Sequence, residues 1–310
     1  MTLLNLAHVT LACIDTVNPI LALRAMHRCQ HGIQFERSVL FTDQPVVDPN
    51  IEVIQVRGID DIRSYSRFVL KELNPHIQSS HLLLVQWDGF VIHPEAWRDD
   101  FLDYDYIGAT WPATGTEPEM VGNGGFSLRS KKLLQALEHI QFTDFFPEDE
   151  QLARVHRSEL ESMGIRFAPP IVGDRFAYEF KPAQIATFGF HGFSNFPDFM
   201  ASDQLADFIG SMPTGLVFNN YFLEFARKIN SKVQDHPEER GLWDALHQKT
   251  TRGIEEAAPY RLEGSQTKHL ISGLCRMKRG ALAHQLAKAR LHASFTLDNL
   301  RLLAKTLIAQ

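Results

Sequence analysis

The chain has 310 residues, of which 44% are hydrophobic and 22% charged, and its formal net charge is −6. This composition is ordinary for a globular protein with a substantial core, and it excludes low-complexity and repeat proteins. No apolar run approaches the roughly 20 residues of a membrane-spanning helix. The cysteines Cys13, Cys29 and Cys275 lie far apart without CxxC spacing, so we expect reduced thiols and a cytoplasmic protein.

The first part of the chain alternates between strand-like and helix-like patterns. The run "HVTLACID" predicts a first strand ending at Asp15, rather than a signal peptide, and Pro19 then begins a helix. "RSVLFTD" ends at Asp43 in the same way, "IEVIQV" follows, and a helix is expected over residues 60–73. "HLLLVQWD" then ends at Asp88. Continuous apolar strands separated by helices predict a parallel sheet covered on both faces, with ligands at the carboxyl ends of its strands.

The middle of the chain is less regular. "VGNGGFSLRSKKLLQAL" passes from a glycine turn into an amphipathic helix, Pro147 precedes an acidic helix start, and "ATFGFHGFSNFP" surrounds His191 with aromatic residues. The glycine turn imitates GxGxxG, but a dinucleotide fingerprint belongs after the first strand, where "IDTVNP" has no glycine. A simple turn, or a close approach of another molecule to the backbone, is the better interpretation. From about residue 200 onward the pattern is helical.

The charge is unevenly distributed. Residues 268–310 carry eight basic residues and one acid, Asp298, so the rest of the chain is acidic. The final segments "RGALAHQLAKARLHASF" and "LDNLRLLAKTLIAQ" predict two amphipathic helices, which most often pack on their own domain or on a second subunit. The alternative is contact of their basic face with an anionic membrane surface. The acidic body and the lack of a recognition motif argue against a nucleic-acid partner.

Five segments of the chain occur in a specific order: "LLLVQWDGFVIHPEAW", "DYDYIGATWP", "VGNGGFSLRS", "PEDE" and "FGFHG". In this order they resemble a bacterial domain family of unassigned activity, which is itself similar to the GT-A glycosyltransferases. The resemblance implies a GT-A-like (Rossmann-like) mixed sheet flanked by helices over residues 1–200, with a helical extension over residues 201–310. It further implies an enzyme that moves a sugar from a nucleoside diphosphate donor to a glycan hydroxyl in surface polysaccharide synthesis.

The same resemblance implies a divalent cation, Mn²⁺ or Mg²⁺, bound at the end of a hydrophobic strand. GT-A enzymes carry a D-x-D motif there, and this chain has Gln86-Trp87-Asp88, in which the last carboxylate alone is retained. His191 matches the late histidine that supplies a second ligand in many GT-A enzymes. A hard cation at this place neutralises the charge of the donor diphosphate. The alternatives are that Asp88 caps a strand end and that His191 packs among aromatic residues.

Glu148 and Asp149 match the position of the catalytic base in inverting GT-A enzymes. We expect Asp149 to be the base and Glu148 to orient the acceptor, which makes the reaction an inverting one. Ordinary capping of a helix start by acidic residues is the alternative.

The expected substrate contacts come from several segments. The donor-binding set is Asp15, Thr16, Asp43, Arg63, Arg67, Gln86 and Trp87. In this set the two arginines, at i and i+4 of one helix, would reach the diphosphate or else lie on a solvated face. The donor sugar and acceptor are expected to meet at Asn123, Gly124 and Gly125. Trp87, Trp111 and Phe126 would offer aromatic platforms, unless they belong to the core.

Two other functions stay open on the sequence. One is a non-catalytic sugar-nucleotide or glycan-binding protein of the same fold, which the missing carboxylate at Gln86 favours. The other is a metal-dependent hydrolase that uses Asp88, His191 and Asp149. The expected location is the cytoplasm, at the inner face of the membrane if the basic helices contact lipid.

Overall fold

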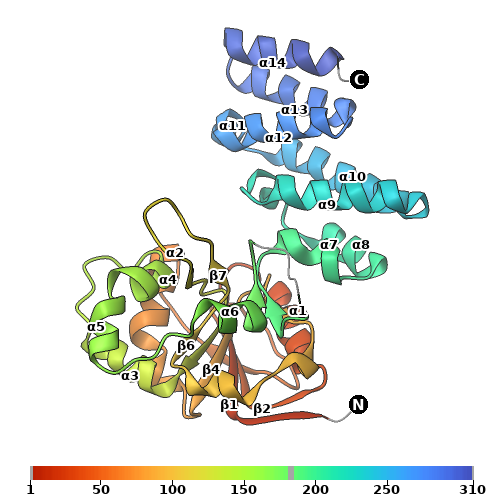
Figure 1. Cartoon of the computed structure of the whole chain (residues 1–310). Helices are drawn as coiled ribbons and strands as arrows, with labels where there is room; N and C mark the ends of the chain where they lie inside the picture. The colour runs from red at the N-terminus through yellow and green to blue at the C-terminus, as the bar shows by residue number, and fades with distance from the viewer. Residues whose placement is uncertain (1–2, 181–184, 309–310) are drawn as a thin grey trace. The chain divides into compact units, whose positions relative to one another are not determined.

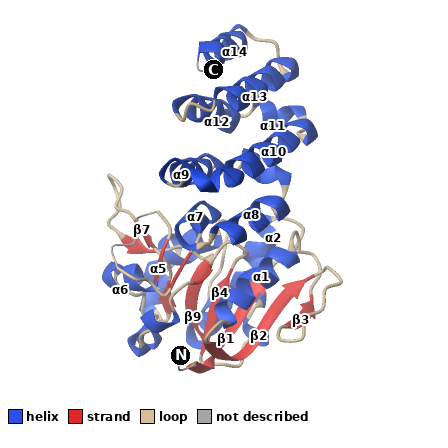
Figure 2. Cartoon of the chain, turned by 90° about the vertical axis from the view of Figure 1, so that its right-hand side faces the viewer, coloured by secondary structure: helices blue, strands red, loops and turns tan. Residues whose placement is uncertain are grey.

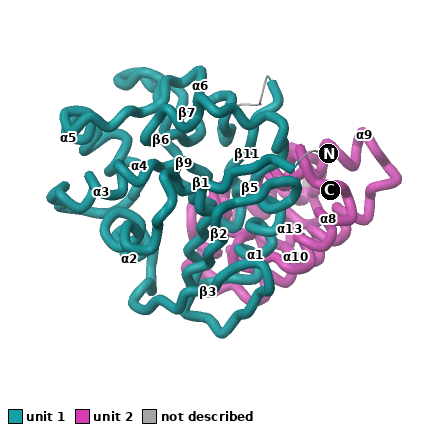
Figure 3. The backbone as a smooth tube through the Cα atoms, turned by 90° about the horizontal axis from the view of Figure 1, so that it is seen from below, with its two compact units in different colours: residues 1–192 teal, residues 193–310 magenta. Residues whose placement is uncertain are grey.

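A computed structural model describes residues 3–180 and 185–308. The chain divides into two compact units, residues 1–192 and 193–310, where the sequence suggested a boundary at residue 200 (Figure 3). Each unit is described by itself. Unit 1 holds the strands, and the described part of unit 2 consists of helices joined by loops (Figure 2). A mixed α/β fold with a helical C-terminal extension, as predicted, is confirmed.

Unit 1 is built on a six-stranded sheet with the order β3-β2-β1-β4-β9-β6. The strands are β1 (Leu4–Ile14), β2 (Ile33–Thr42), β3 (Glu52–Gln55), β4 (His81–Val85), β6 (Tyr106–Ile107) and β9 (Phe126–Ser130). β1, β2, β3 and β4 run parallel, as their continuous apolar sequences predicted, whereas β9 runs antiparallel to β4 and β6. The chain leaves β1 toward β2 and β3 and later returns to β4 on the other side of β1. The carboxyl ends of β1 and β4 therefore mark the switch point, where α/β sheets bind ligands.

The helices of unit 1 begin at residues suited to capping. α1 (Pro19–Gln30) starts with a proline after Asn18, whose side chain accepts a hydrogen bond from the amide of Leu21. α2 (Ile62–Arg67) starts at a capping box between Asp61 and Ser64 and continues as a π-helical turn over Phe68–Glu72, close to the predicted helix over residues 60–73. α3 (Lys131–His139) is capped by Ser130. The remaining helices are α4 (Glu148–Glu150), α5 (Arg157–Ser162) and α6 (Pro170–Phe176), with a second π-helical turn over Gln151–Val155.

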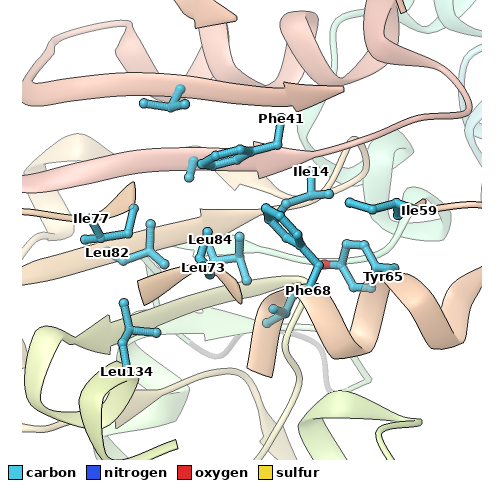
Figure 4. Packing of buried hydrophobic residues seen from close by; sticks show 13 residues of the cluster. Ile14, Phe41, Ile59, Tyr65, Phe68, Leu73, Ile77, Leu82, Leu84 and Leu134 are labelled. Atoms are coloured by element: carbon cyan, nitrogen blue, oxygen red, sulfur yellow. The ribbon is translucent and has the colours of Figure 1, made fainter. Parts of the chain in front are cut away.

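One face of the large sheet packs on α2 and α3. Phe41 of β2, Leu84 of β4 and Phe68 meet there, together with Leu134 of α3 (Figure 4). The ring centroids of Phe41 and Phe68 lie 5.4 Å apart. Because side chains alternate along a strand, the neighbouring residues point to the opposite face, where α1 packs. This two-sided cover holds the strand ends of the sheet in place.

Two small sheets complete unit 1. The first has the order β10-β11-β5, from β10 (Ala177–Tyr178), β11 (Gly189–Phe190) and β5 (Phe90–Val91). The second pairs β7 (Thr110–Trp111) with β8 (Met120–Val121). Each of these strands has two residues, too few for a recognisable sequence period.

Unit 2 consists of successive helices (Figure 1). They are α7 (Phe196–Phe199), α8 (Ser202–Ser211), α9 (Phe222–Asp235), α10 (Arg240–Glu256), α11 (Pro259–Glu263), α12 (Ser265–Arg276), α13 (Gly280–Ala293) and α14 (Leu297–Ile308). The buried side chains of Phe225, Ile229, Leu246, Leu274 and Leu286 form part of its core. Within the described ranges, no helix is both long and apolar enough to cross a membrane.

Candidate functional site

His191 lies at the centre of a buried polar cluster beside the three-stranded sheet. Strand pairing brings the members of this cluster together. β5 pairs antiparallel with β11, so Asp88, two residues before β5, meets His191, the residue directly after β11. β10 pairs parallel with β11, so Glu179, the residue directly after β10, also lies beside His191. The two residues of the sequence-based metal prediction, Asp88 and His191, are thus neighbours.

Both ring nitrogens of His191 face carboxylates. Its Nδ1 lies 3.0 Å from Oε1 of Glu179, and its Nε2 lies 3.3 Å from Oδ1 of Asp88. Oε1 of Gln86 is 3.2 Å from the same Nε2. The amide nitrogen of Asn123 donates to Oε2 of Glu179 over 2.8 Å and lies 2.9 Å from Nδ1 of His191. The imidazole is therefore held in one orientation from both sides.

The electrostatics of the cluster are dominated by its two carboxylates. Burial lowers the pKa of His191, but Asp88 and Glu179 raise it more, so that the net pKa lies well above its usual value. Asp88 is 9% exposed, and the side chain of Glu179 is likewise 9% exposed. One imidazolium between two carboxylates leaves a net charge of −1. A cation or a hydrogen-bond donor on a ligand would complete the cluster.

The glycine turn "VGNGG" lets His191 approach the backbone. A Cβ atom on Gly125 would lie 2.1 Å from Nε2 of His191, and one on Gly89 would lie 3.2 Å from its Cδ2. Asn123 has φ = 38°, in the left-handed region that Asn tolerates better than most residues. Its Oδ1 accepts a hydrogen bond from the amide of Phe126. The sequence predicted that another molecule could approach the backbone of this turn closely. In the structure the side chain that does so is His191 of the same chain.

Replacing Gly125 by alanine is expected to destabilise unit 1 by about 1–3 kcal/mol, because the new methyl group overlaps the His191 ring. Gly115→Ala is the matched control, since nothing lies within 4 Å of a Cβ there. The control should change the free energy of unfolding by no more than about 0.5 kcal/mol. Urea denaturation measures both variants. Equal stability of the two would contradict the packing of His191 on Gly125.

Next to this cluster lies a second, fully buried pair. Nη2 of Arg129, in β9, donates to both carboxylate oxygens of Glu148 over 3.1 and 3.0 Å, and the Arg129 side chain is 0% exposed. Burial raises the pKa of Glu148, and Arg129 opposes this. A Cβ on Gly124 would lie 1.8 Å from Oε1 of Glu148. Glu148 therefore packs against the buried side of the glycine turn, and its carboxylate does not point into solvent from the helix start.

Asp149 has a different environment from Glu148. It is half-buried, and its Oδ2 accepts a hydrogen bond of 3.2 Å from the amide of Gly124, while its Oδ1 accepts one of 2.9 Å from the amide of Glu150. The two amide donors orient the carboxylate beside the turn over residues 123–125. Of the two predicted catalytic acids, Asp149 is the one with a partly exposed carboxylate.

A pocket of about 350 Å³ opens at the carboxyl ends of β1 and β4. Four residues of the predicted donor-binding set line it, namely Asp15, Thr16, Gln86 and Trp87. Its apolar walls include Ile14 and Ile59, and Tyr65 and Asp61 also line it. Gln86 joins the pocket to the His191 cluster, because its amide nitrogen lies 3.0 Å from Oη of Tyr65 and its Oε1 faces Nε2 of His191. Pocket and cluster thus share one residue, Gln86.

The other predicted contacts lie elsewhere. Arg63 pairs with Asp144 over 2.6 Å and Arg67 with Glu72 over 3.3 Å, and neither arginine lines the pocket. Asp43 follows β2 and accepts a hydrogen bond from the side chain of Gln44, also outside the pocket.

The aromatic platforms separate into two groups. Trp111 is 9% exposed, beneath the guanidinium of Arg154 at 4.3 Å, and Phe126 is 0% exposed, so both belong to the core. Trp87 lines the pocket.

A divalent cation fits the donor chemistry of the cluster when it takes the place of the proton on Nε2 of His191, because a protonated ring nitrogen cannot bind a metal. Asp88 and His191 offer one oxygen and one nitrogen that face each other, and Glu179 lies behind the imidazole, as carboxylates commonly do behind metal-ligating histidines. Among the described residues no group of three or more His, Cys, Asp or Glu side chains is arranged to hold a metal. A cation here would therefore take its other ligands from a bound substrate and water.

Sequence reasoning missed Glu179, Arg129 and Tyr65. Glu179 lies in "RFAYEFKP" without a motif around it, and its pairing with His191 depends on two strands of two residues each. Arg129 carried a signal, since a charge within the apolar strand "FSLRS" must find a buried partner. Tyr65 is an inward residue of the predicted helix over residues 60–73.

Comparison with known proteins gives one family match. Residues 49–191 match the model of a family described as "Protein of unknown function (DUF5672)". Among curated proteins none matches the chain.

Solved structures that are similar to the chain at a low level include the following three. The galactosyltransferase LgtC, in complex with donor and acceptor sugar analogues, is 12% identical with a TM-score of 0.34, over 59% of this chain and 86% of its own. TarS 1–349 of S. aureus, in complex with UDP-GlcNAc, is 11% identical with a TM-score of 0.33, over 97% and 92%. The mannosyltransferase PcManGT of Pyrobaculum calidifontis, in complex with GDP-Man and Mn²⁺, is 12% identical with a TM-score of 0.31, over 97% and 85%.

These values are too low to transfer a donor, a metal or an activity to this chain. The resemblance to a domain family of unassigned activity, expected from the ordered sequence segments, is confirmed over residues 49–191 by the match to the family of unknown function DUF5672.

Proposed function

We propose that unit 1 is a glycosyltransferase domain, which moves a sugar from a nucleoside diphosphate sugar to a glycan hydroxyl. The observation that carries the proposal is that Gln86 both lines the pocket and contacts His191 of the cluster. A pocket at the switch point of the sheet is joined through Gln86 to a buried acidic cluster, and Asp149 stands beside the same glycine turn as that cluster.

The pocket suits the nucleoside part of the donor. Its volume of about 350 Å³ lies within the range of small-molecule sites, and Ile14, Ile59 and Trp87 give it apolar walls for a base. Asp15 already accepts hydrogen bonds from the amides of Val17 and Asn18, which fixes its carboxylate at the rim. Its remaining lone pairs would accept hydrogen bonds from the ribose hydroxyls.

Asp88 and His191 are the residues that would hold Mn²⁺ or Mg²⁺. Such an ion supplies charge neutralisation for the diphosphate as it leaves. In this chain Glu179 fixes the ring of His191, and Asn123 fixes Glu179 in turn. These two residues act by positioning.

The transfer step assigns distinct roles to the two acids at the start of α4. The acceptor oxygen forms a bond to the anomeric carbon, while the bond from that carbon to the donor phosphate oxygen breaks and its electron pair leaves with the diphosphate. Asp149 takes the proton of the acceptor hydroxyl, and attack from the face opposite the leaving group inverts the anomeric centre. Glu148 was expected to orient the acceptor, but its buried pair with Arg129 favours a supporting role under the turn.

We also propose that the acceptor belongs to a surface polysaccharide under synthesis. In this proposal unit 2 contacts the membrane or a second copy of the chain. On α14, Leu297, Leu300 and Leu307 are exposed beside the basic residues Arg301 and Lys305. Exposed apolar side chains among cations suit an anionic lipid surface. Retention of the full-length protein by anionic vesicles at low salt is the expected result, and failure of retention removes this part of the proposal.

The experiment that tests the donor site is thermal unfolding of the full-length protein with UDP, GDP, CMP or dTDP, with and without Mn²⁺. A nucleotide at 100 times its Kd is expected to stabilise the folded state by about 2.7 kcal/mol and to raise Tm accordingly. We expect one nucleoside diphosphate to act, with a larger effect when Mn²⁺ is present. Asp88→Asn should remove the Mn²⁺-dependent part, whereas Glu95→Gln, at an exposed carboxylate on the other side of β5, should not.

The outcomes separate the competing functions. A Tm shift of the same size with and without Mn²⁺ would support a nucleotide site that binds no metal. Binding without transfer to any glycan acceptor favours the non-catalytic protein, and release of free sugar without an acceptor favours the hydrolase. No shift with any of the four nucleotides rejects the donor site.

A further inference from the structure

A second cavity, of about 700 Å³, lies entirely within unit 2. It opens between α9, α10 and the turn that precedes α13. Its charged lining consists of Arg240, Lys278 and Arg279 with one acid, Asp244, and His247 lies beside them. Three permanent cations and one carboxylate leave a net charge of +2 with the histidine neutral.

The positive charge of this cavity has little compensation within the protein. Arg240 approaches Asp244 only to 4.0 Å, and both side chains are exposed. The terminal nitrogens of Arg279, the ammonium of Lys278 and the ring of His247 have no hydrogen bond or ion pair with any residue in the described part of the chain. Polar groups that converge on a cavity without internal partners are available to a ligand.

Arg279 is held in place before any ligand arrives. Its guanidinium lies 4.0 Å from the ring centroid of Trp243, which is 5% exposed, and its Nε donates to Oδ1 of Asn230 over 2.7 Å. Burial lowers the pKa of Arg279, while Asp244 raises it and Arg240 lowers it. A guanidinium that is already ordered loses little conformational entropy when it binds an anion.

Lys278 occupies a backbone position that usually holds glycine. Its φ is 57°, in the left-handed region, and its amide donates to the carbonyl of Cys275 at the end of α12. A lysine there is less favourable than glycine for the turn itself. The turn directs the chain so that Lys278 lines the cavity next to Arg279.

From this arrangement we propose that the cavity of unit 2 binds a phosphate group. The two negative charges of a phosphate dianion balance the net charge of +2 in the cavity. A carboxylate, with one negative charge, would balance only half of it. The planar guanidinium of Arg279 offers two parallel donors to phosphate oxygens, with Lys278 and Arg240 as further cations. The phosphate comes either from a soluble ligand or from a lipid headgroup. This site goes beyond the transferase proposal, and it needs neither a nucleotide nor unit 1.

The test uses full-length protein and two probes at constant ionic strength. Inorganic phosphate is titrated by calorimetry, and phosphatidic acid vesicles are used in flotation, with phosphatidylcholine vesicles as the blank. The double variant Lys278→Gln/Arg279→Gln should weaken the binding of phosphate about tenfold or more. Arg276→Gln/Lys288→Gln removes the same charge from exposed positions outside the cavity, and it should change the affinity less than twofold.

A third variant protects the test against misfolding. Lys278→Gly removes one charge and relieves the left-handed backbone, so its Tm should not fall while phosphate binding weakens about threefold. Phosphate binding that depends on the cavity residues identifies a soluble ligand, and vesicle binding alone with the same dependence identifies a lipid headgroup. The absence of binding to both probes, or equal losses in the two double variants, overturns the proposal.

Discussion

Replacing Arg129 by methionine is expected to lower the free energy of unfolding of unit 1 by about 3–5 kcal/mol, because Glu148 would remain buried without its partner. Arg129 also donates from Nε to Oγ of Ser127, and its guanidinium lies 5.5 Å from the ring centroid of Tyr106. The substitution therefore removes the central cation of a fully buried network. Hydrogen exchange of the β9 amides measures the loss locally, in the strand that carries the substitution.

A double-mutant cycle separates the charge effect from lost packing. The variant Arg129→Met/Glu148→Met should be more stable than Arg129→Met alone, since it buries no unpaired charge. Arg98→Met is the exposed control. Arg98 pairs with Asp100 over 2.8 Å at the surface, where water screens the pair, so protection of β9 should stay nearly unchanged. If the double variant is as unstable as the single one, the pair does not act as a unit.

Replacing Asp149 by asparagine is expected to lower kcat of sugar transfer by about 10²- to 10⁴-fold, which is the usual contribution of a positioned general base. Asparagine keeps one oxygen that can accept the hydrogen bond from the amide of Gly124, so the turn should keep its shape, and the acceptor for the amide of Glu150 is lost. The dissociation constant of the nucleotide should change by no more than about twofold, because the effect falls on the transition state. The rate is measured with the nucleotide sugar whose nucleotide raises Tm.

The neighbouring acid provides the matched control for Asp149. Glu150 lies in the same helical turn, pairs with Arg154 over 3.1 Å and has a half-exposed side chain. Glu150→Gln should keep kcat within about threefold of the wild type, since an exposed helix pair contributes little. A comparable loss in both variants would assign these acids to helix capping. Transfer that survives Asp149→Asn would require another base.

Unit 1 shows which parts of a site a sequence can predict. The apolar runs of β1 and β4 are long enough to be recognised as buried parallel strands, so the position of Asp15 directly after β1 followed from the pattern. Asp88 was expected at the end of its strand, but β4 ends at Val85 and Asp88 lies in the turn that leads to β5. The pairing of Glu179 with His191 did not follow, because β10 and β11 have two residues each. Such short strands have no period, and long-range pairing alone defines them.

The different environments of Glu148 and Asp149 also could not be predicted from the sequence. In the sequence they are adjacent acids at a helix start, with nothing to distinguish them. The fold buries Glu148 on Arg129, from a distant strand, and leaves Asp149 half-buried beside Gly124. Only a tertiary contact could separate a supporting carboxylate from one that is open to a substrate.

By itself, the sequence determined the local structure: the parallel strands of unit 1, the helix after Asp61 and the helical character of unit 2. These depend on periodicity and capping, which neighbouring residues encode. Tertiary structure alone decided what surrounds His191, which pocket Gln86 lines, and that Trp243 and Arg279 meet at one cavity. Such contacts join residues far apart in the chain, and their geometry arises only when the packed elements set the register between them.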